Sequence, residues 1–182
     1  MTVLGKLEWL DKLEWKAAAE VPELLAEPVR DGIGSIPGYA AAIDPGLADT
    51  AAFCAEYDVP MAASANCVIV HGKRAGESTY AAVLVLATHR ADVNGVIRKH
   101  LGVRKISFAA QDDAVSTTRM EYGGITPIGL PADWPVLVDE AVANAGPVVI
   151  GSGMRASKLL VDGADLAKLP TAEVLQLASP AS

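Results

Sequence analysis

The stretch Tyr122–Pro131 reads Tyr-Gly-Gly-Ile-Thr-Pro-Ile-Gly-Leu-Pro. Three glycines and two prolines in ten residues exclude a regular helix or a central strand. Gly123 and Gly124 can adopt backbone angles that other residues avoid, and Pro127 stiffens the exit from the segment. Such a composition is typical of a turn between two elements. It also suits a rigid wall, where N–H and C=O groups approach a ligand without an intervening Cβ atom.

The chain around this loop has the composition of a single globular domain. Its 182 residues are 51% hydrophobic and 20% charged. No apolar run approaches the ~20 residues of a membrane helix, and Met1 to Lys16 alternates charged with apolar residues, unlike a signal peptide. Cys54 and Cys67 lie in apolar stretches, as buried free thiols of a reducing compartment do. We therefore expect a cytoplasmic protein with no membrane partner.

Charge is unevenly distributed along the chain. Residues 1–63 carry eleven acids and four bases, a net charge of −7, whereas residues 64–182 carry eleven of each. The sequence pI near 4.9 argues against DNA and against non-specific nucleic-acid binding. Residues 93–111 nevertheless contain Arg98, Lys99, Arg104 and Lys105 without an acid. This cluster is either a solvated helix face or a local contact for RNA phosphates.

The first third of the chain is predicted to be helical. Residues 16–27 form one expected helix, which ends before Pro28. Asp44 and Pro45 are predicted to begin a second helix that continues to about Tyr57. Trp9 and Trp15 are expected to pack the N-terminal segment onto the body of the protein.

From residue 66 onward, short apolar runs predict strands. The loop from His71 to Gly76 has hairpin length, so the strands on either side of it should be antiparallel. Helices and strands mix without βαβ alternation, which predicts an α+β fold with a mixed sheet. The expected strands are 67–70, 81–87, 106–109, 136–138, 148–150, 159–161 and 174–177, and the expected helices are 92–101, 111–118, 139–145 and 163–169.

The segment 147–156 superficially matches a strand followed by the dinucleotide-binding pattern G-x-G-x-x-A. The match fails on context, because only Ser157 and Lys158 separate it from the apolar run 159–161, which leaves no room for a helix. A hairpin is the better prediction. Its loop, with Gly151, Ser152, Gly153 and Arg155, either cradles a phosphate or ribose or is a tight turn with an exposed arginine.

Other chemistries find little support in the sequence. The three histidines are far apart and lack partners at metal-ligand spacing, so no metal or other cofactor is expected. The G-x-S-x-G elbow of serine hydrolases is missing, and Cys67 begins an apolar strand without a nearby base. Asp139 follows a predicted strand and either caps the next helix or contacts a ligand.

Several separated motifs together resemble the YbaK/prolyl-tRNA synthetase-associated editing-domain family. They occur in the family's order and span about residues 45–178, so we expect residues 1–44 to form an extension packed on a core domain of residues 45–182. The motifs are residues 66–70, 90–93, 123–131, 136–140 and 149–155.

This resemblance implies a largely antiparallel curved sheet or barrel flanked by helices. It also implies hydrolysis of the ester of a mischarged aminoacyl-tRNA carrying a small amino acid, in trans, with an aminoacyl-tRNA synthetase as a further partner. The family's G-x-x-x-P loop, here Gly123 to Pro127, would hold the aminoacyl end. The implied contacts at the reacting ester are Asn66, Gly123, Gly124 and Ile125, and the implied substrate-binding residues are Thr126, Pro127, Gly129, Asp139, Gly151, Ser152, Gly153 and Arg155.

Asn66 departs from the family pattern. Alignment of the strand 68–70 places it where the family has a lysine, and an amide offers only a neutral hydrogen bond, about half as strong as one from an ammonium group. Asn66 and the backbone amides of the loop would then be the polar contacts, with a ribose hydroxyl as proton shuttle. The alternative is a non-catalytic module of the same fold that binds an aminoacyl-tRNA or a nucleotide.

Overall fold

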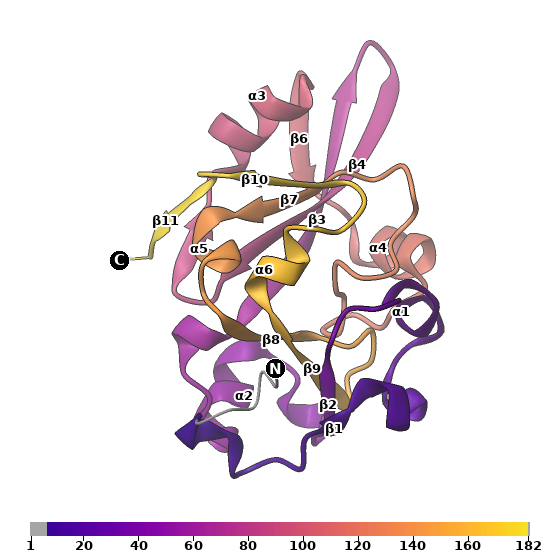
Figure 1. Ribbon diagram of the computed structural model, residues 1–182. Helices are drawn as coiled ribbons and strands as arrows, with labels where there is room; N and C mark the ends of the chain where they lie inside the picture. The colour runs from indigo at the N-terminus through magenta and orange to yellow at the C-terminus, as the bar shows by residue number, and fades with distance from the viewer. Residues whose placement is uncertain (1–6, 182) are drawn as a thin grey trace.

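The structure, a computed structural model, describes residues 7–181 and contains two main β-sheets (Figure 1). The five-stranded sheet contains, in spatial order, β10 (Ala172–Leu175), β7 (Val136–Asp139), β4 (Glu77–Leu86), β3 (Ala65–Arg74) and β6 (Lys105–Phe108). The four-stranded sheet contains β1 (Lys16–Ala17), β2 (Tyr39–Ala42), β9 (Ser157–Asp162) and β8 (Pro147–Gly151). A small third sheet pairs β11 (Ala178–Pro180) with β5 (His89–Ala91).

The helices of the described residues are short and lie outside the sheets or in the connections between them (Figure 1). The α-helices are α1 (Glu27–Gly32), α2 (Thr50–Tyr57), α3 (Arg98–Leu101), α4 (Gln111–Thr118), α5 (Glu140–Ala143) and α6 (Gly163–Leu166). A π-helical turn, η6 (Val93–Ile97), precedes α3, and 3₁₀ turns form η1 (Glu8–Leu10), η2 (Ala18–Glu20), η3 (Pro22–Leu24), η4 (Pro45–Leu47) and η5 (Met61–Ala63). Among residues 7–181, no helix combines the length and apolarity needed to cross a membrane.

Alternating side chains give each sheet two buried faces. On β8, Val148 and Ile150 enter the main core, whereas Val149 between them enters a second cluster with Phe53 of α2. The main core also takes Leu84 of β4, so it lies between the two sheets. A third cluster covers the far face of the five-stranded sheet with η6, α3 and the C-terminal segment. The sheets are therefore inner layers, which explains the apolar runs in their sequences.

The two main sheets meet at the start of β3. Ser64, just before β3, forms an isolated parallel bridge with Val149 of β8. The same region of β3 pairs with the end of β4, from Ala65 opposite Leu86. This junction places the beginning of β3 beside β8, whose other neighbour is β9, and the candidate site lies here.

The α+β fold expected from the sequence is confirmed. Six of the eight strand pairings are antiparallel, and β7 pairs in parallel with both β4 and β10. The two predicted hairpins are present as β3–β4 and β8–β9. Ala75 and Gly76 form the β3–β4 turn with φ of 51° and 83°, the positive angles of a two-residue type I′ hairpin. Trp9 and Trp15 pack against the second cluster, as expected.

The helix predicted for residues 16–27 is wrong. Lys16 and Ala17 pair with β2, and the chain then runs through the turns η2 and η3 before α1. Pro22 lies inside the predicted helix and has no N–H to donate, so it begins η3 instead. Pro28, which was expected to end a helix, occupies the first turn of α1, where a missing N–H has no cost.

Smaller boundary errors have local causes. The second predicted helix is divided into η4 and α2, and Asp44 caps only η4 by accepting a hydrogen bond from Gly46 N at 2.9 Å. The last predicted strand lies at 172–175 rather than 174–177. Leu177 is instead held by Asp139, whose Oδ1 accepts hydrogen bonds from Leu177 N at 3.1 Å and from Ala178 N at 3.2 Å.

Asp139 is only 1% exposed and fixes the C-terminal segment, while its Oδ2 caps α5 by accepting from Ala141 N at 3.3 Å. We expect Asp139→Ala to lower the free energy of unfolding by about 2–4 kcal/mol, because it leaves buried N–H groups unpaired. Glu140→Ala is the matched control, since Glu140 is adjacent and exposed. This substitution should lower the free energy of unfolding by less than about 1 kcal/mol. Urea unfolding measures both, and equal losses would contradict this role of Asp139.

Candidate functional site

Two loops are joined through their backbones beside the end of β8. Gly153 N donates to Gly124 O at 2.7 Å, and Glu121 N donates to Gly153 O at 2.9 Å. Arg155 N donates to Glu121 Oε1 at 2.8 Å. The glycine-rich loop 122–131 and the Gly-Ser-Gly hairpin loop, singled out separately in the sequence, are therefore one rigid unit.

Glycine is required where the two loops touch. A Cβ atom on Gly151 would lie 2.7 Å from Ile125 O, with Gly124 O closer still. A Cβ atom on Gly124 would lie 2.7 Å from the backbone of Met154. Real Cβ atoms essentially never approach backbone atoms this closely, so a side chain at either position would have to displace the neighbouring backbone.

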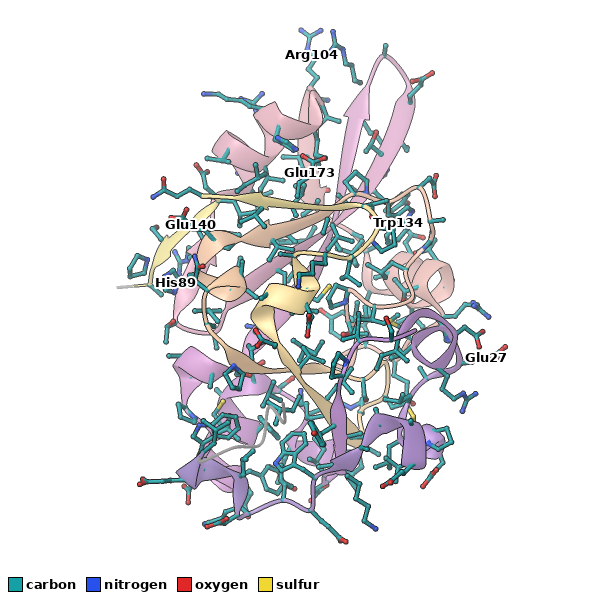
Figure 2. All side chains as sticks on the ribbon, in the orientation of Figure 1. Glu27, His89, Arg104, Trp134, Glu140 and Glu173 are labelled. Carbon is teal, nitrogen blue, oxygen red and sulfur yellow. The ribbon has the colours of Figure 1, made fainter. Side chains whose placement is uncertain are left out.

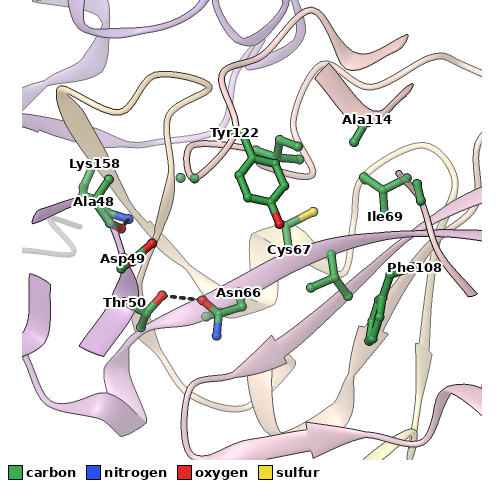
Figure 3. A pocket seen from close by; sticks show the side chains of 16 residues that line it. Ala48, Asp49, Thr50, Asn66, Cys67, Ile69, Phe108, Ala114, Tyr122 and Lys158 are labelled. Atoms are coloured by element: carbon green, nitrogen blue, oxygen red, sulfur yellow. Dashed lines mark hydrogen bonds between the residues drawn. The ribbon is translucent and has the colours of Figure 1, made fainter. Parts of the chain in front are cut away.

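A cavity of about 440 Å³ lies between this loop unit and the start of β3. Its size is within the range of small-molecule sites. Tyr122 points its phenol ring into the cavity, across from Asn66 and Cys67 (Figure 3). The lining residues are Ala48, Asp49, Thr50, Ala65, Asn66, Cys67, Val68, Ile69, Phe108, Ala109, Ala114, Tyr122, Gly123, Ile125, Gly151 and Lys158.

The Asn66 amide is held by α2. The Thr50 hydroxyl at the start of α2 donates a hydrogen bond to Asn66 Oδ1 (Figure 3). Because the carbonyl oxygen of the amide is occupied, its NH₂ group is the part of Asn66 left to donate to a ligand. Thr50 is thus a positioning residue for Asn66.

Lys158 brings a positive charge to the same cavity from β9. It is 7% exposed, and its Nζ donates to Ala48 O at 2.9 Å and lies 5.1 Å from the centre of the Phe53 ring. Among residues 7–181 it forms no salt bridge with a carboxylate. Burial lowers the pKa of the Lys158 ammonium group from 10.5 to about 8. Cys54 and Asp49 act in the opposite direction and raise this pKa, whereas the positive charge of Arg155 lowers it further. Lys158 is therefore mostly charged at pH 7.

Cys67 lines the cavity but is not an activated nucleophile. Burial raises the pKa of its thiol to about 12, so the group is protonated at neutral pH. Burial likewise raises the pKa of the Cys54 thiol, near Lys158. Both thiols are free in the described chain.

The structure brings four of the sequence-predicted site residues onto the cavity: Asn66, Gly123, Ile125 and Gly151. The other eight lie outside its lining, and several have a visible structural contact. Ser152 Oγ hydrogen-bonds Ser157 Oγ at 2.7 Å, and Arg155 donates to Tyr122 O and Pro45 O at 3.0 Å each. These eight are Gly124, Thr126, Pro127, Gly129, Asp139, Ser152, Gly153 and Arg155.

Sequence reasoning missed Lys158, Asp49, Thr50 and Tyr122 as cavity residues. Lys158 carried one signal, a single charge at the edge of the apolar run 159–161. Among the described residues, no three His, Cys, Asp or Glu side chains lie close enough together to hold a metal ion.

Solved structures share this fold. A proposed trans-editing enzyme for prolyl tRNA synthetase matches 85% of this chain and 96% of its own, with a TM-score of 0.70 and 17% identity. The hypothetical protein APE2540 matches 72% of this chain and 85% of its own, with a TM-score of 0.64 and 22% identity. A proposed signal transduction protein from Marinobacter aquaeolei VT8 matches 83% of this chain but 30% of its own, with a TM-score of 0.56 and 16% identity.

The fold and its loop-lined cavity thus define a YbaK-like α+β domain. Residues 44–169 match the aminoacyl-tRNA editing domain, and the chain belongs to that family. No curated protein matches the sequence. The matched region includes Asn66, the glycine-rich loop and Lys158.

Gly151→Ala tests the contact between the two loops. The added methyl group must displace the backbone of Gly124 and Ile125, so we expect a loss of about 1–3 kcal/mol in the free energy of unfolding. Gly38→Ala is the matched control, because its Cβ would meet side chains at ordinary distances of 3.5–3.6 Å. Denaturant unfolding compares the two variants, and equal stability would show that the loops are not in fixed contact.

The lowered pKa of Lys158 predicts a pH-dependent stability. Between pH 8 and 10.5 the unfolded chain binds this proton and the folded chain does not, so unfolding becomes less favourable as pH rises. Relative to Lys158→Met, whose side chain does not titrate, the free energy of unfolding of the wild type should increase by about 3 kcal/mol from pH 8 to pH 10.5. Urea unfolding of both proteins at several pH values measures the difference. A constant difference would mean that the ammonium group is solvated.

Proposed function

We propose that this protein hydrolyses the ester bond of a tRNA mischarged with a small amino acid, acting in trans. The observation that carries the proposal is the cavity where the side-chain-free loop faces Asn66 and Lys158. Membership in the editing-domain family supports the aminoacyl-tRNA as substrate class. Prolyl-tRNA synthetase is a candidate partner, since a protein of the same fold is described as a trans-editing enzyme for it.

The strand register gives the spacing of the polar groups. Lys158 pairs with Gly151 on β8, and β8 meets β3 at the bridge from Val149 to Ser64, two residues before Asn66. Lys158 and Asn66 are therefore two strands apart, or roughly 10 Å between backbones at ~4.8 Å per strand. Both side chains line the same cavity, so an ester bound there could contact both.

Hydrolysis requires stabilisation of a developing negative charge. A water molecule attacks the ester carbonyl carbon, and the carbonyl oxygen becomes an oxyanion to which Asn66 and Lys158 donate hydrogen bonds. Collapse of this intermediate breaks the bond to the ribose oxygen, which takes up the proton lost by water through the neighbouring ribose hydroxyl. The products are the free amino acid and the uncharged tRNA.

Asp49 is placed to bind the positively charged amino group of the substrate. An aminoacyl ester carries a free α-ammonium group, and among residues 7–181 Asp49 is the one carboxylate that lines the cavity. A carboxylate at this position would bind the ammonium and direct the carbonyl toward the donors. Small and medium apolar side chains, including Ala65, Val68 and Ala114, line the rest of the cavity and favour a small amino-acid side chain.

The second candidate is a module that binds an aminoacyl-tRNA without hydrolysing it. Asn66 at a position where the resemblance implies lysine favours this reading. The buried ammonium group of Lys158 favours hydrolysis, because it restores a positive charge to the cavity from a different strand.

Purified protein should deacylate at least one member of a panel of mischarged tRNAs. We expect Asn66→Ala to reduce kcat/KM about 10²-fold, the usual effect of removing one oxyanion donor, and Lys158→Met to reduce it at least as much. Thr50→Val keeps the shape of Thr50 but removes the hydroxyl that orients Asn66, so a smaller loss is expected. Thermal unfolding of each variant confirms that the fold is intact.

Unchanged rates in both Asn66→Ala and Lys158→Met would remove these groups from the reaction. If no tRNA is deacylated while aminoacyl analogues still bind, the binding module is the correct reading and the hydrolase proposal is wrong.

A further inference from the structure

A second hollow, of about 690 Å³, follows the edge strand β6. We call it the basic groove. Its lining contains four cationic side chains and, among the described residues, no carboxylate. The lining residues are His71, Lys73, Asn94, Arg98, Arg104, Lys105, Ile106 and Ser107.

Within residues 7–181, no carboxylate forms a salt bridge with the four cations of the basic groove, which are Lys73, Arg98, Arg104 and Lys105. Arg98 donates from Nε to Asn94 O at 2.8 Å, which fixes its side chain without cancelling its charge. Figure 2 shows Arg104 extending into solvent at the end of the molecule. Because the whole chain has a net charge of −7, a local cationic surface of this kind is selective for an anion that docks there.

The basic groove and the cavity share two strands. On β3, Ile69 lines the cavity and His71 lines the groove; on β6, Phe108 lines the cavity and Ser107 the groove. Lys105 is three residues from Phe108, a distance of roughly 10 Å at ~3.3 Å per residue. The two side chains are an odd number of residues apart and so lie on opposite faces of β6, which is an edge strand. A chain of phosphates attached to a group inside the cavity would pass around this edge to reach the groove.

The mouth of the cavity has exposed aromatic rings. Phe108 is 63% exposed and Tyr122 is 51% exposed, although large aromatic side chains usually avoid water. Both rings line the cavity, and unstacked bases bind to such rings. On the other side of Tyr122, the hollow beside the first turn of α4 contains Asp112 together with Arg155, so it has no excess of cations to attract phosphates. The charges thus favour an approach along β6.

We propose that the basic groove binds the phosphate backbone of the RNA strand whose aminoacylated 3′ end enters the cavity, with Phe108 and Tyr122 stacking on its last bases. The inference rests on the proposed function, because it assumes that the cavity receives the 3′ end. It assigns a binding role to the basic cluster of residues 93–111, which the sequence left open between a solvated face and an RNA contact.

The test is RNA binding without chemistry. An uncharged RNA hairpin with a single-stranded 3′ tail is titrated with the protein between 50 and 200 mM salt, followed by fluorescence anisotropy. Arg104→Gln/Lys105→Gln should weaken binding about tenfold or more and reduce the slope of log K against log salt by about 1.4, since each lost phosphate contact contributes about 0.7 for a single strand. Phe108→Ala should weaken binding by at least about fivefold.

Lys12→Gln/Lys168→Gln is the matched control, because it removes the same charge from two exposed lysines outside the groove. Its affinity and salt slope should equal those of the wild type. A second readout is hydrolysis of an aminoacyl ester of adenosine, which has no phosphates. The groove variant should keep the wild-type rate on this ester while its kcat/KM on aminoacyl-tRNA falls, mainly through KM.

Equal RNA binding by the groove and control variants would overturn the inference. So would selective binding of an acidic polypeptide, such as polyglutamate, by the groove when RNA does not bind. Groove-dependent RNA binding without hydrolysis of any ester would support the groove and contradict the proposed hydrolase, so the two failures are distinguishable.

Discussion

Backbone-on-backbone contact at Gly151 and Gly124 is the constraint on which the candidate site depends. At this contact the loop 122–131 lies against the β8–β9 hairpin with no side chains between them. Because β8 packs against buried clusters on both of its faces, the close-packed core fixes the position of the loop. A wall built in this way needs no reorganisation when a ligand arrives, which is the condition for effective hydrogen bonding to a developing charge.

The buried ammonium group of Lys158 is difficult to explain as a stabilising feature. Desolvation disfavours its charge, and within the described chain it has a carbonyl oxygen and an aromatic ring as partners but no carboxylate salt bridge. A methionine of similar length would avoid that cost. The presence of a buried lysine with a lowered pKa on the wall of a cavity is therefore more consistent with a role in binding a ligand than with a role in stabilising the fold. Together with Asn66, it gives the cavity one charged and one neutral donor from strands on either side of β8.

The sequence predicted the parts of the structure in which local pattern and tertiary packing agree. Apolar runs located the inner strands, and the glycine clusters located the two loops of the site. The helix predicted for 16–27 is wrong because Lys16 and Ala17 pair with β2, which is distant in sequence, and because Pro22 has no N–H to donate inside a helix. Lys158 was missed for a related reason: its place in the cavity depends on its pairing with Gly151, whereas in the sequence it only borders an apolar strand. The roles of the predicted contacts that lie outside the cavity remain predictions.

Two opposing charge distributions bear on how such a site would select its substrate. Acids dominate residues 1–63, and they include Asp49 at the cavity, whereas the cations of the basic groove come from β3, α3 and the segment leading into β6. A polyanion is repelled by the acidic residues of segment 1–63 and attracted at the basic groove, so its approach is restricted in orientation before any specific contact forms. Salt screens exposed charges over about 8 Å at physiological ionic strength. The roughly 10 Å between Lys105 and Phe108 is comparable to that length, so under the proposed mode of binding the groove would act on phosphates that follow the 3′ end and only weakly on an ester in the cavity. The proposals thereby give substrate capture and ester chemistry to different side chains, which would allow each to be altered without the other.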